Sequence, residues 1–148
     1  MKPTKLKEIG TILPSEVNGV IERVGLCGRD LIWYVQPHFP WVCDSELSLT
    51  LTRDVLIHDF VPPDTVKHRL KMLDIPRERV IKAYVCNFIV ALKGVRELLN
   101  HVRESGIRYD RVVVTSDHGE MLGEYGLYLH QEYDLPQLTI VPWLEVKL

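Results

Sequence analysis

Hydrophobic positions recur every three or four residues in two long stretches, and this spacing predicts amphipathic helices. The longer stretch begins at Pro76, a residue suited to the first turn of a helix, and runs to about Ser105. The shorter stretch spans residues 14–26. A third, short helix is predicted from Asp64, which can cap it, to Leu73. The apolar stripe of the long helix consists of Ile81, Tyr84, Val85, Phe88, Leu92, Val95, Leu99 and Val102.

Three short, largely apolar runs predict strands, and the first two are predicted to be buried on both faces. They lie at residues 31–35, 112–115 and 138–141. The first run stops at Pro37 and Pro40, which cannot donate ladder hydrogen bonds. Residues 41–63 carry no clear period, so the sequence assigns no element there.

The alternation of apolar strands with helices predicts one α/β domain over residues 1–148, with a mostly parallel sheet and helices on both faces. Ligands bind at the carboxyl ends of the strands in such sheets. His38 follows the first strand, and Asp117 and His118 follow the second. These side chains would meet in space if the two strands are neighbours.

Composition narrows the class of protein. The 148 residues are 46% hydrophobic and carry a formal net charge of -2, which fits one globular domain and argues against general nucleic-acid binding. Neither a signal-peptide core near the start nor an apolar run of about 18 residues is present, so we expect no membrane span.

The three cysteines are odd in number and unclustered, which predicts neither a disulfide framework nor a Cys-x-x-Cys metal site. A reducing, cytoplasmic location is therefore the expectation. Cys86 lies within the long helix and is interpreted as a small buried apolar residue.

Asp117 and His118 stand at the exit of a strand into a glycine-rich loop. A carboxylate and an imidazole are suitable ligands for a divalent cation, although such a dipeptide is usually only a polar turn. The surrounding residues favour the metal interpretation. Residues 112–120, Val-Val-Val-Thr-Ser-Asp-His-Gly-Glu, resemble the metal-binding signature of the alkaline phosphatase superfamily, which includes sulfatases and phosphoethanolamine transferases.

The resemblance covers about residues 31–146. Residues 121–130 look like the segment that follows the signature in sulfatases and phosphoethanolamine transferases, and Val141-Pro142-Trp143 is similar to the start of their next strand. Upstream, residues 36–40 resemble the sulfatase Pro-His-x-Pro segment. The long helix, with Tyr84 and Asn87, sits where a sulfatase-like helix would be.

The resemblance implies a truncated sulfatase-like core that acts on a phosphate or sulfate ester with a divalent metal ion, Zn²⁺, Mn²⁺ or Ca²⁺. Asp117 and His118 would be metal ligands. His130 would lie near the transferred group as a proton donor or further ligand, and His38 would contact the ester or its leaving oxygen. Glu120 is interpreted as a carboxylate that orders the loop.

The chain departs from these families in lacking a nucleophile. Sulfatases use a Cys or Ser in a Cys/Ser-x-Pro-x-Arg motif, the transferases use a Thr, and no such motif or early acidic ligand is present. The chain therefore resembles the carboxyl-terminal half of a sulfatase-like domain.

Two functions stay open. One is a hydrolase domain that takes its nucleophile from a complementing partner chain. The other is a non-catalytic relative that acts as a binding or oligomerisation module. A truncated sheet exposes apolar surface, so we expect self-association, as a homo-oligomer, or a complementing chain.

The remaining histidines and the aromatic residues receive structural interpretations. His58, His68 and His101 lie in polar surroundings and are predicted at the surface. The aromatic residues predicted to pack in the core are Trp33, Tyr34, Phe88 and Trp143.

Overall fold

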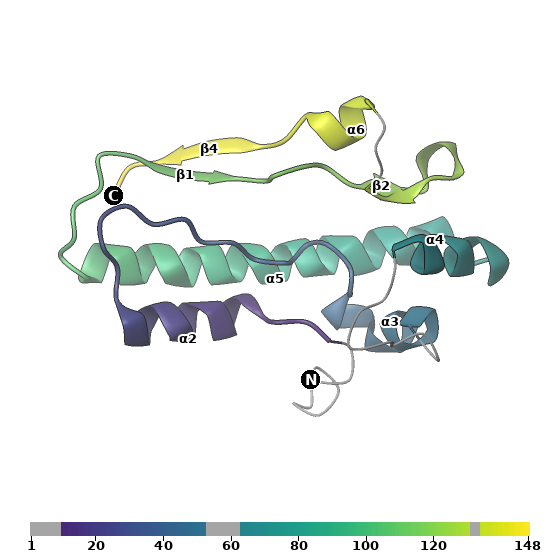
Figure 1. Ribbon diagram of the computed structural model, residues 1–148, viewed down its shortest axis with the longest axis horizontal. Helices are drawn as coiled ribbons and strands as arrows, with labels where there is room; N and C mark the ends of the chain where they lie inside the picture. Colours follow the sequence, from purple (N-terminus) through teal and green to yellow (C-terminus); the bar gives the residue numbers. More distant parts are fainter. Residues whose placement is uncertain (1–9, 53–62, 131–133) are drawn as a thin grey trace.

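The computed structural model describes residues 10–52, 63–130 and 134–148. A long helix, α5 (Arg77–Glu104), runs along the molecule, with α2 (Pro14–Val24) and α3 (Ser45–Thr52) on one side of it and the strands on the other (Figure 1). The predictions of a helix after Pro76 and of a helix from residue 14 are confirmed.

Helix α2 packs closely against α5 at Gly94. A Cβ at this position would overlap the ring of Pro14, so only glycine lets the two helices come this near. The side-chain nitrogen of Asn18 donates to the carbonyl oxygen of Gly94 at 2.9 Å. The Tyr34 hydroxyl in turn donates to the side-chain oxygen of Asn18 at 2.6 Å, which ties the extended chain after α2 to both helices.

Residues 42–52 form helices that the sequence did not predict. A short 3-10 helix, η1 (Val42–Asp44), leads directly into α3, and α4 (Pro63–Met72) confirms the predicted third helix. Two buried apolar side chains of α3, Leu47 and Leu51, enter the core at this end of the molecule. The core comprises Phe39, Trp41, Leu47, Leu51, Val66, Leu70, Val80, Ala83 and Leu129.

The predicted parallel α/β sheet is wrong. The described residues form two separate two-stranded sheets, and both are antiparallel. Strand β1 (Val112–Thr115) pairs with β4 (Trp143–Val146), and β2 (Met121–Leu122) pairs with β3 (Tyr128–Leu129). The apolar run of β1 was recognised as a strand, but its composition carries no information on the direction of its partner.

The predicted strand at residues 138–141 is also wrong. Pro136 opens a short helix, α6 (Pro136–Thr139), because its fixed φ angle suits a first helical turn. The strand begins only after Pro142, at Trp143, as β4.

Residues 31–35 were predicted to be a strand buried on both faces, and this prediction is wrong too. Within the described chain, the segment forms neither a helix nor a strand. Leu31 is 97% exposed and Trp33 is 71% exposed. The expected core packing of Trp33, Phe88 and Trp143 is therefore also wrong, since all three are exposed, whereas Tyr34 is half-buried.

A disulfide joins Cys43 in η1 to Cys86 in α5, which corrects the prediction of unpaired cysteines. Cys86 is thus a cross-link and not simply an apolar core residue. Cys27 is the free, exposed cysteine that makes the number odd. The count of three concealed a pair 43 residues apart in sequence.

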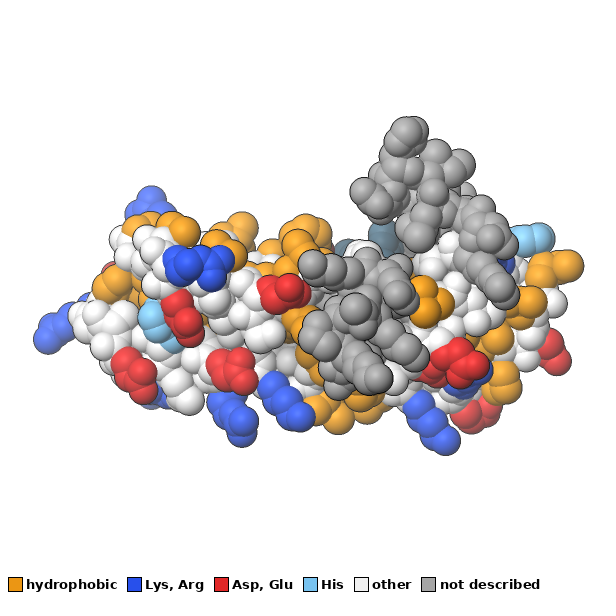
Figure 2. Space-filling model, turned by 90° about the horizontal axis from the view of Figure 1, so that it is seen from below, with side chains coloured by type: hydrophobic (Ala, Val, Ile, Leu, Met, Phe, Trp, Pro, Cys, Tyr) orange, Lys and Arg blue, Asp and Glu red, His pale blue; other side chains and the backbone are white. Residues whose placement is uncertain are grey.

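The surface of the described residues mixes charged and hydrophobic side chains. Figure 2 shows one face, on which hydrophobic side chains reach the surface along the length of the molecule between acidic and basic ones. Within the part of the chain that the structure describes, no helix is both long and apolar enough to cross a bilayer.

Candidate functional site

Three histidines from three separate segments come together beside the short sheet of β2 and β3. The ring centroids of His118 and His130 are 4.4 Å apart, and those of His38 and His130 are 5.1 Å apart. The His38 and His118 centroids are 6.3 Å apart. The structure therefore brings together the histidines that the sequence singled out, although the parallel sheet expected to do this does not form.

Backbone carbonyls set the tautomers of two of these rings. The Nδ1 atom of His38 lies 2.6 Å from the carbonyl oxygen of Phe39, and the Nδ1 atom of His118 lies 2.7 Å from that of Gly119. A carbonyl oxygen only accepts, so each Nδ1 carries the proton and donates it. In the neutral ring this leaves Nε2 with a free lone pair, the arrangement found in metal-binding histidines.

The Nε2 atom of His38 is buried and has no hydrogen-bond partner among the described residues. Burial is the main cause that lowers the pKa values of His38 and His130. The charge of the neighbouring His118 lowers both pKa values further. Both shifts favour the neutral form of the ring, which is the form that can bind a cation.

Two carboxyl groups border the histidines. The Asp117 carboxylate lies 3.8 Å from Nε2 of His118, and the Glu120 carboxylate lies 3.9 Å from Nε2 of His38. Burial, with a smaller contribution from the charge of Asp117, raises the pKa of Glu120 to about 8. One oxygen of Glu120 is buried without a partner among the described atoms. Glu120 thus faces the site, a placement that its interpretation as a loop-ordering residue missed.

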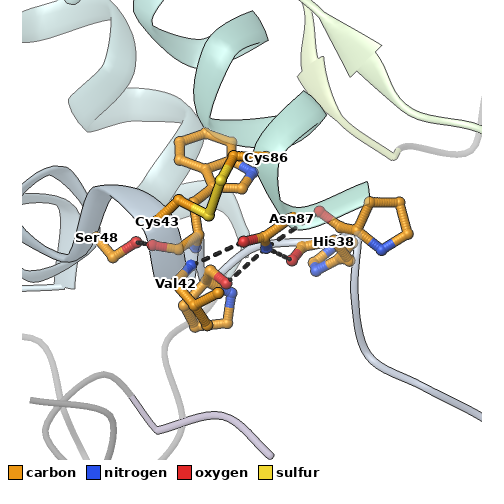
Figure 3. Close-up of a disulfide and its surroundings, with 9 residues drawn as sticks. His38, Val42, Cys43, Ser48, Cys86 and Asn87 are labelled. Atoms are coloured by element: carbon orange, nitrogen blue, oxygen red, sulfur yellow. Dashed lines mark hydrogen bonds between the residues drawn. A yellow bond between two sulfur atoms is a disulfide. The ribbon is translucent and has the colours of Figure 1, made fainter. Parts of the chain in front are cut away.

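Asn87 on α5 holds the turn that carries His38 (Figure 3). Its side-chain nitrogen donates to the carbonyl oxygens of His38 at 3.1 Å and of Pro40 at 3.0 Å. Its side-chain oxygen accepts a hydrogen bond from the backbone nitrogen of Val42 at 2.8 Å. Asn87 is fully buried, so the turn is fixed to the helix from within the core. The sequence placed Asn87 on the right helix but did not reveal this role.

Strand β3 delivers His130 to the site through an unusual backbone conformation. Leu129, immediately before it, has a φ of 63°, in the left-handed region that a bulky residue rarely adopts. The Leu129 side chain is buried in the core, and its backbone pairs with Met121. Core packing thus holds the turn of the chain that directs His130 towards the other two rings.

Gly119 lies in the loop between Asp117 and β2, in close contact with α6. A Cβ at this position would overlap the carbonyl oxygen of Gln137, which is backbone and cannot move aside cheaply. The Gly119 nitrogen donates to the carbonyl oxygen of Leu138 at 2.8 Å. The glycine of the Asp-His-Gly-Glu motif is therefore required by close packing of the loop against α6.

We expect Gly119→Ala to lower the free energy of unfolding by about 2 kcal/mol, because the methyl group overpacks the contact with Gln137. Urea denaturation measures this change. Gly19→Ala in α2 is the matched control, since a Cβ there meets only the end of the Arg23 side chain. Alanine should stabilise α2 by up to about 1 kcal/mol. Equal unfolding midpoints for the two variants would contradict the packing explanation.

Within the described chain, the histidines that were predicted to lie at the surface are not part of this cluster. His68 is exposed on α4 and His101 is half-buried near the end of α5, whereas His58 lies outside the described residues. Within the described ranges, no three His, Cys, Asp or Glu side chains already converge on one metal position. A cation would have to draw the rings and carboxylates together, and the unpaired atoms of His38 and Glu120 give it donors to use.

Comparisons of the chain with protein-family models, with curated proteins and with solved structures find no match. Function is therefore inferred from the geometry of these residues and from the motifs that carry the resemblance.

Proposed function

We propose that the chain forms the divalent-metal and ester-binding part of a phosphoester or sulfate-ester hydrolase centre. The observation that carries this proposal is the convergence of His38, His118 and His130, which are up to 92 positions apart in the sequence but lie within 6.3 Å in ring-centroid distance. The Nε2 atom of His38 is buried without a hydrogen-bond partner among the described residues, and such an atom is costly unless a ligand uses it.

Asp117 and His118 are the proposed metal ligands. Their donor set of one carboxylate and one imidazole suits Zn²⁺ or Mn²⁺, and the carboxylate also suits Ca²⁺. When bound, such an ion polarises an ester oxygen and stabilises charge on it.

His38 and His130 are the proposed groups for the ester. Neutral His130 is a further ligand, and its protonated form donates a proton to the leaving oxygen. The buried Nε2 of His38 contacts the ester group or leaving oxygen. The carbonyl of Phe39 fixes the orientation of that ring.

The nucleophile must come from outside the residues identified here, because the chain has no sulfatase-type motif. We therefore propose that the active form is either a homo-oligomer or a complex with a complementing chain. The Cys43–Cys86 disulfide supports an oxidising compartment over the cytoplasmic location that the cysteine count suggested.

The first test of this function is metal content. Purified protein dialysed against Zn²⁺ or Mn²⁺ is expected to retain about one ion per chain, and Asp117→Ala or His118→Ala should weaken binding by at least about 10-fold. Elemental analysis and titration calorimetry measure both values. His68→Ala, which removes an exposed histidine on α4, is the matched control and should bind as the unaltered chain does.

Unchanged metal binding in Asp117→Ala and His118→Ala would contradict the proposed centre.

The absence of a nucleophile motif favours the second function, a non-catalytic binding module. This second function would be supported if the protein binds metal but does not hydrolyse phosphate or sulfate esters. The assay is made with the chain alone, as a homo-oligomer, and with a complementing chain added.

A further inference from the structure

Two buried acceptor atoms face each other in the candidate site. Nε2 of His38 and Oε1 of Glu120 are 3.9 Å apart, and the Glu120 side chain is only 5% exposed. Each of the two atoms is buried without a hydrogen-bond partner among the described residues. Their separation is longer than a hydrogen bond, so neither atom satisfies the other. A polar atom buried in this way is costly unless a ligand uses it.

The chemistry of the two atoms restricts what can lie between them. Nδ1 of His38 donates to the carbonyl oxygen of Phe39 at 2.6 Å, so Nε2 of the neutral ring carries a lone pair. A carboxylate oxygen of Glu120 also accepts. An occupant must therefore be a cation or must donate two hydrogen bonds. The oxygen of a phosphate or sulfate ester only accepts, so it cannot satisfy both atoms by itself.

The charge around the pair favours a cation over a neutral donor such as water. Burial is the largest influence on the pKa values of His38 and Glu120, and the charge of Asp117 acts to raise both values. Both groups therefore lie in the negative field of Asp117. A cation is stabilised by this field, whereas a neutral molecule gains little from it.

The separation of the two atoms suits a divalent ion. An imidazole nitrogen and a carboxylate oxygen bind Zn²⁺ at about 2.0–2.2 Å. Two such ligand atoms lie about 3.4 Å apart in tetrahedral geometry, and at most about 4.2 Å apart on opposite sides of the ion. The observed 3.9 Å lies within this range, so a shift of about 0.5 Å brings the pair to tetrahedral geometry.

Both side chains come from segments that the core holds in place. Asn87 is fully buried and donates to the carbonyl oxygen of His38 at 3.1 Å (Figure 3). Glu120 lies between Gly119, which is packed against α6, and Met121, which is fully buried and belongs to the strand that pairs with β3. Ligand groups that are fixed before the ion binds lower the entropic cost of binding.

We propose that His38 and Glu120 bind one divalent cation between them, with Zn²⁺ as an ion that accepts both an imidazole and a carboxylate. Water completes the coordination. An ester oxygen can replace one water, and the contact proposed between His38 and the ester then runs through the ion. The proposed function gives Glu120 no such role. Binding between His38 and Glu120 does not require that Asp117 and His118 hold an ion of their own.

Nuclear magnetic resonance of ¹⁵N-labelled histidine follows each ring separately while Zn²⁺ is added. The signal of Nε2 of His38, assigned through bonds from its backbone, should shift on binding. Nδ1 keeps its hydrogen bond to Phe39 and should shift little. A Cys27→Ser background removes the free thiol, which could also bind Zn²⁺. This measurement needs no variant within the site.

Glu120→Gln tests the second ligand. The variant keeps the size of the side chain, and its amide can donate to Nε2 of His38, but it removes the anionic ligand. We expect the shift of His38 to need at least about 10-fold more Zn²⁺ than in the unaltered chain. Glu104→Gln, which removes an exposed carboxylate on α5, is the matched control and should respond as the unaltered chain does.

A shift of His38 Nε2 that Glu120→Gln moves to higher Zn²⁺ concentration, with Glu104→Gln unchanged, would support the proposal. A His38 ring that Zn²⁺ leaves unaltered would overturn it. A response that Glu120→Gln does not change would also overturn it, because a proton or a water molecule would then satisfy the pair.

The same experiment on Asp117→Ala separates this proposal from the proposed function. If the response of His118 to Zn²⁺ is the same with and without Asp117, the proposed centre at Asp117 and His118 is contradicted. The result for His38 and Glu120 is still decided by the shift of His38 alone.

Discussion

Removal of the Cys43–Cys86 disulfide is expected to lower the free energy of unfolding by about 4 kcal/mol. The bridge closes a loop between residues 43 positions apart, and loss of this constraint increases the entropy of the unfolded chain. Urea denaturation of the double variant Cys43→Ala/Cys86→Ala, and of the unaltered chain with and without a thiol reductant, measures the change.

Cys27→Ala is the control for this prediction, because Cys27 is exposed and unpaired. It should unfold as the unaltered chain does, and the reductant should have no further effect on the double variant. A double variant as stable as the unaltered chain would show that the bridge contributes nothing. A reductant that destabilises the double variant equally would show that it acts elsewhere.

The disulfide also affects the candidate site through its neighbours in sequence. Cys43 follows Val42, whose nitrogen donates to the side chain of Asn87, and Cys86 precedes Asn87 on α5 (Figure 3). The bridge and the hydrogen bond thus fasten the same turn to the same helix. We expect reduction to weaken metal binding as well as folding, because the turn carries His38.

The helices could be predicted because they depend on residues that are close together in the sequence. The apolar spacing of α5 and the proline at its start are sufficient to define it, and Pro14 does the same for α2. The sheet was not predictable in this way. The apolar run of β1 predicts a strand, but the direction of its partner depends on how the chain returns through α6.

The histidines proposed for the site lie close together although the predicted parallel sheet does not form. His38 and His118 were expected to meet at the edge of a parallel sheet, and they lie near each other without one. A turn after residues 31–35 carries His38, and hydrogen bonds from α5 hold that turn. The motifs therefore named residues that lie close together, and their role in a functional site stays a prediction. The long-range contacts of Asn87 and Gly119 could be seen only in three dimensions.

The pairing of Cys43 with Cys86 was hidden for a related reason. Three scattered cysteines give no local indication of which two approach, and the partners are joined only when η1 packs on α5. For residues 31–35 the sequence predicted more burial than the chain provides. Their composition predicts two buried faces, and the chain itself supplies cover for one.

Asn87→Ala is expected to lower the free energy of unfolding by about 3 kcal/mol and to weaken metal binding. Asn87 is fully buried, and its removal leaves the Val42 nitrogen and the carbonyl oxygens of His38 and Pro40 without their partners. Each unpaired buried group costs about 1–3 kcal/mol. Urea denaturation and metal titration measure the two effects.

Asn87→Asp separates hydrogen bonding from packing, because it keeps the size of the side chain and one acceptor for Val42. An ionised carboxylate cannot donate to the carbonyl oxygens, so it faces them as an additional acceptor. We expect this variant to be at least as destabilised at pH 7 as Asn87→Ala, and to recover part of the loss at low pH, where a protonated carboxyl donates once more. Asn100→Ala, on an exposed position of the same helix, is the control and should change stability by no more than about 0.5 kcal/mol. A variant Asn87→Asp that folds and binds metal as the unaltered chain does would show that the amide donors do not hold the His38 turn.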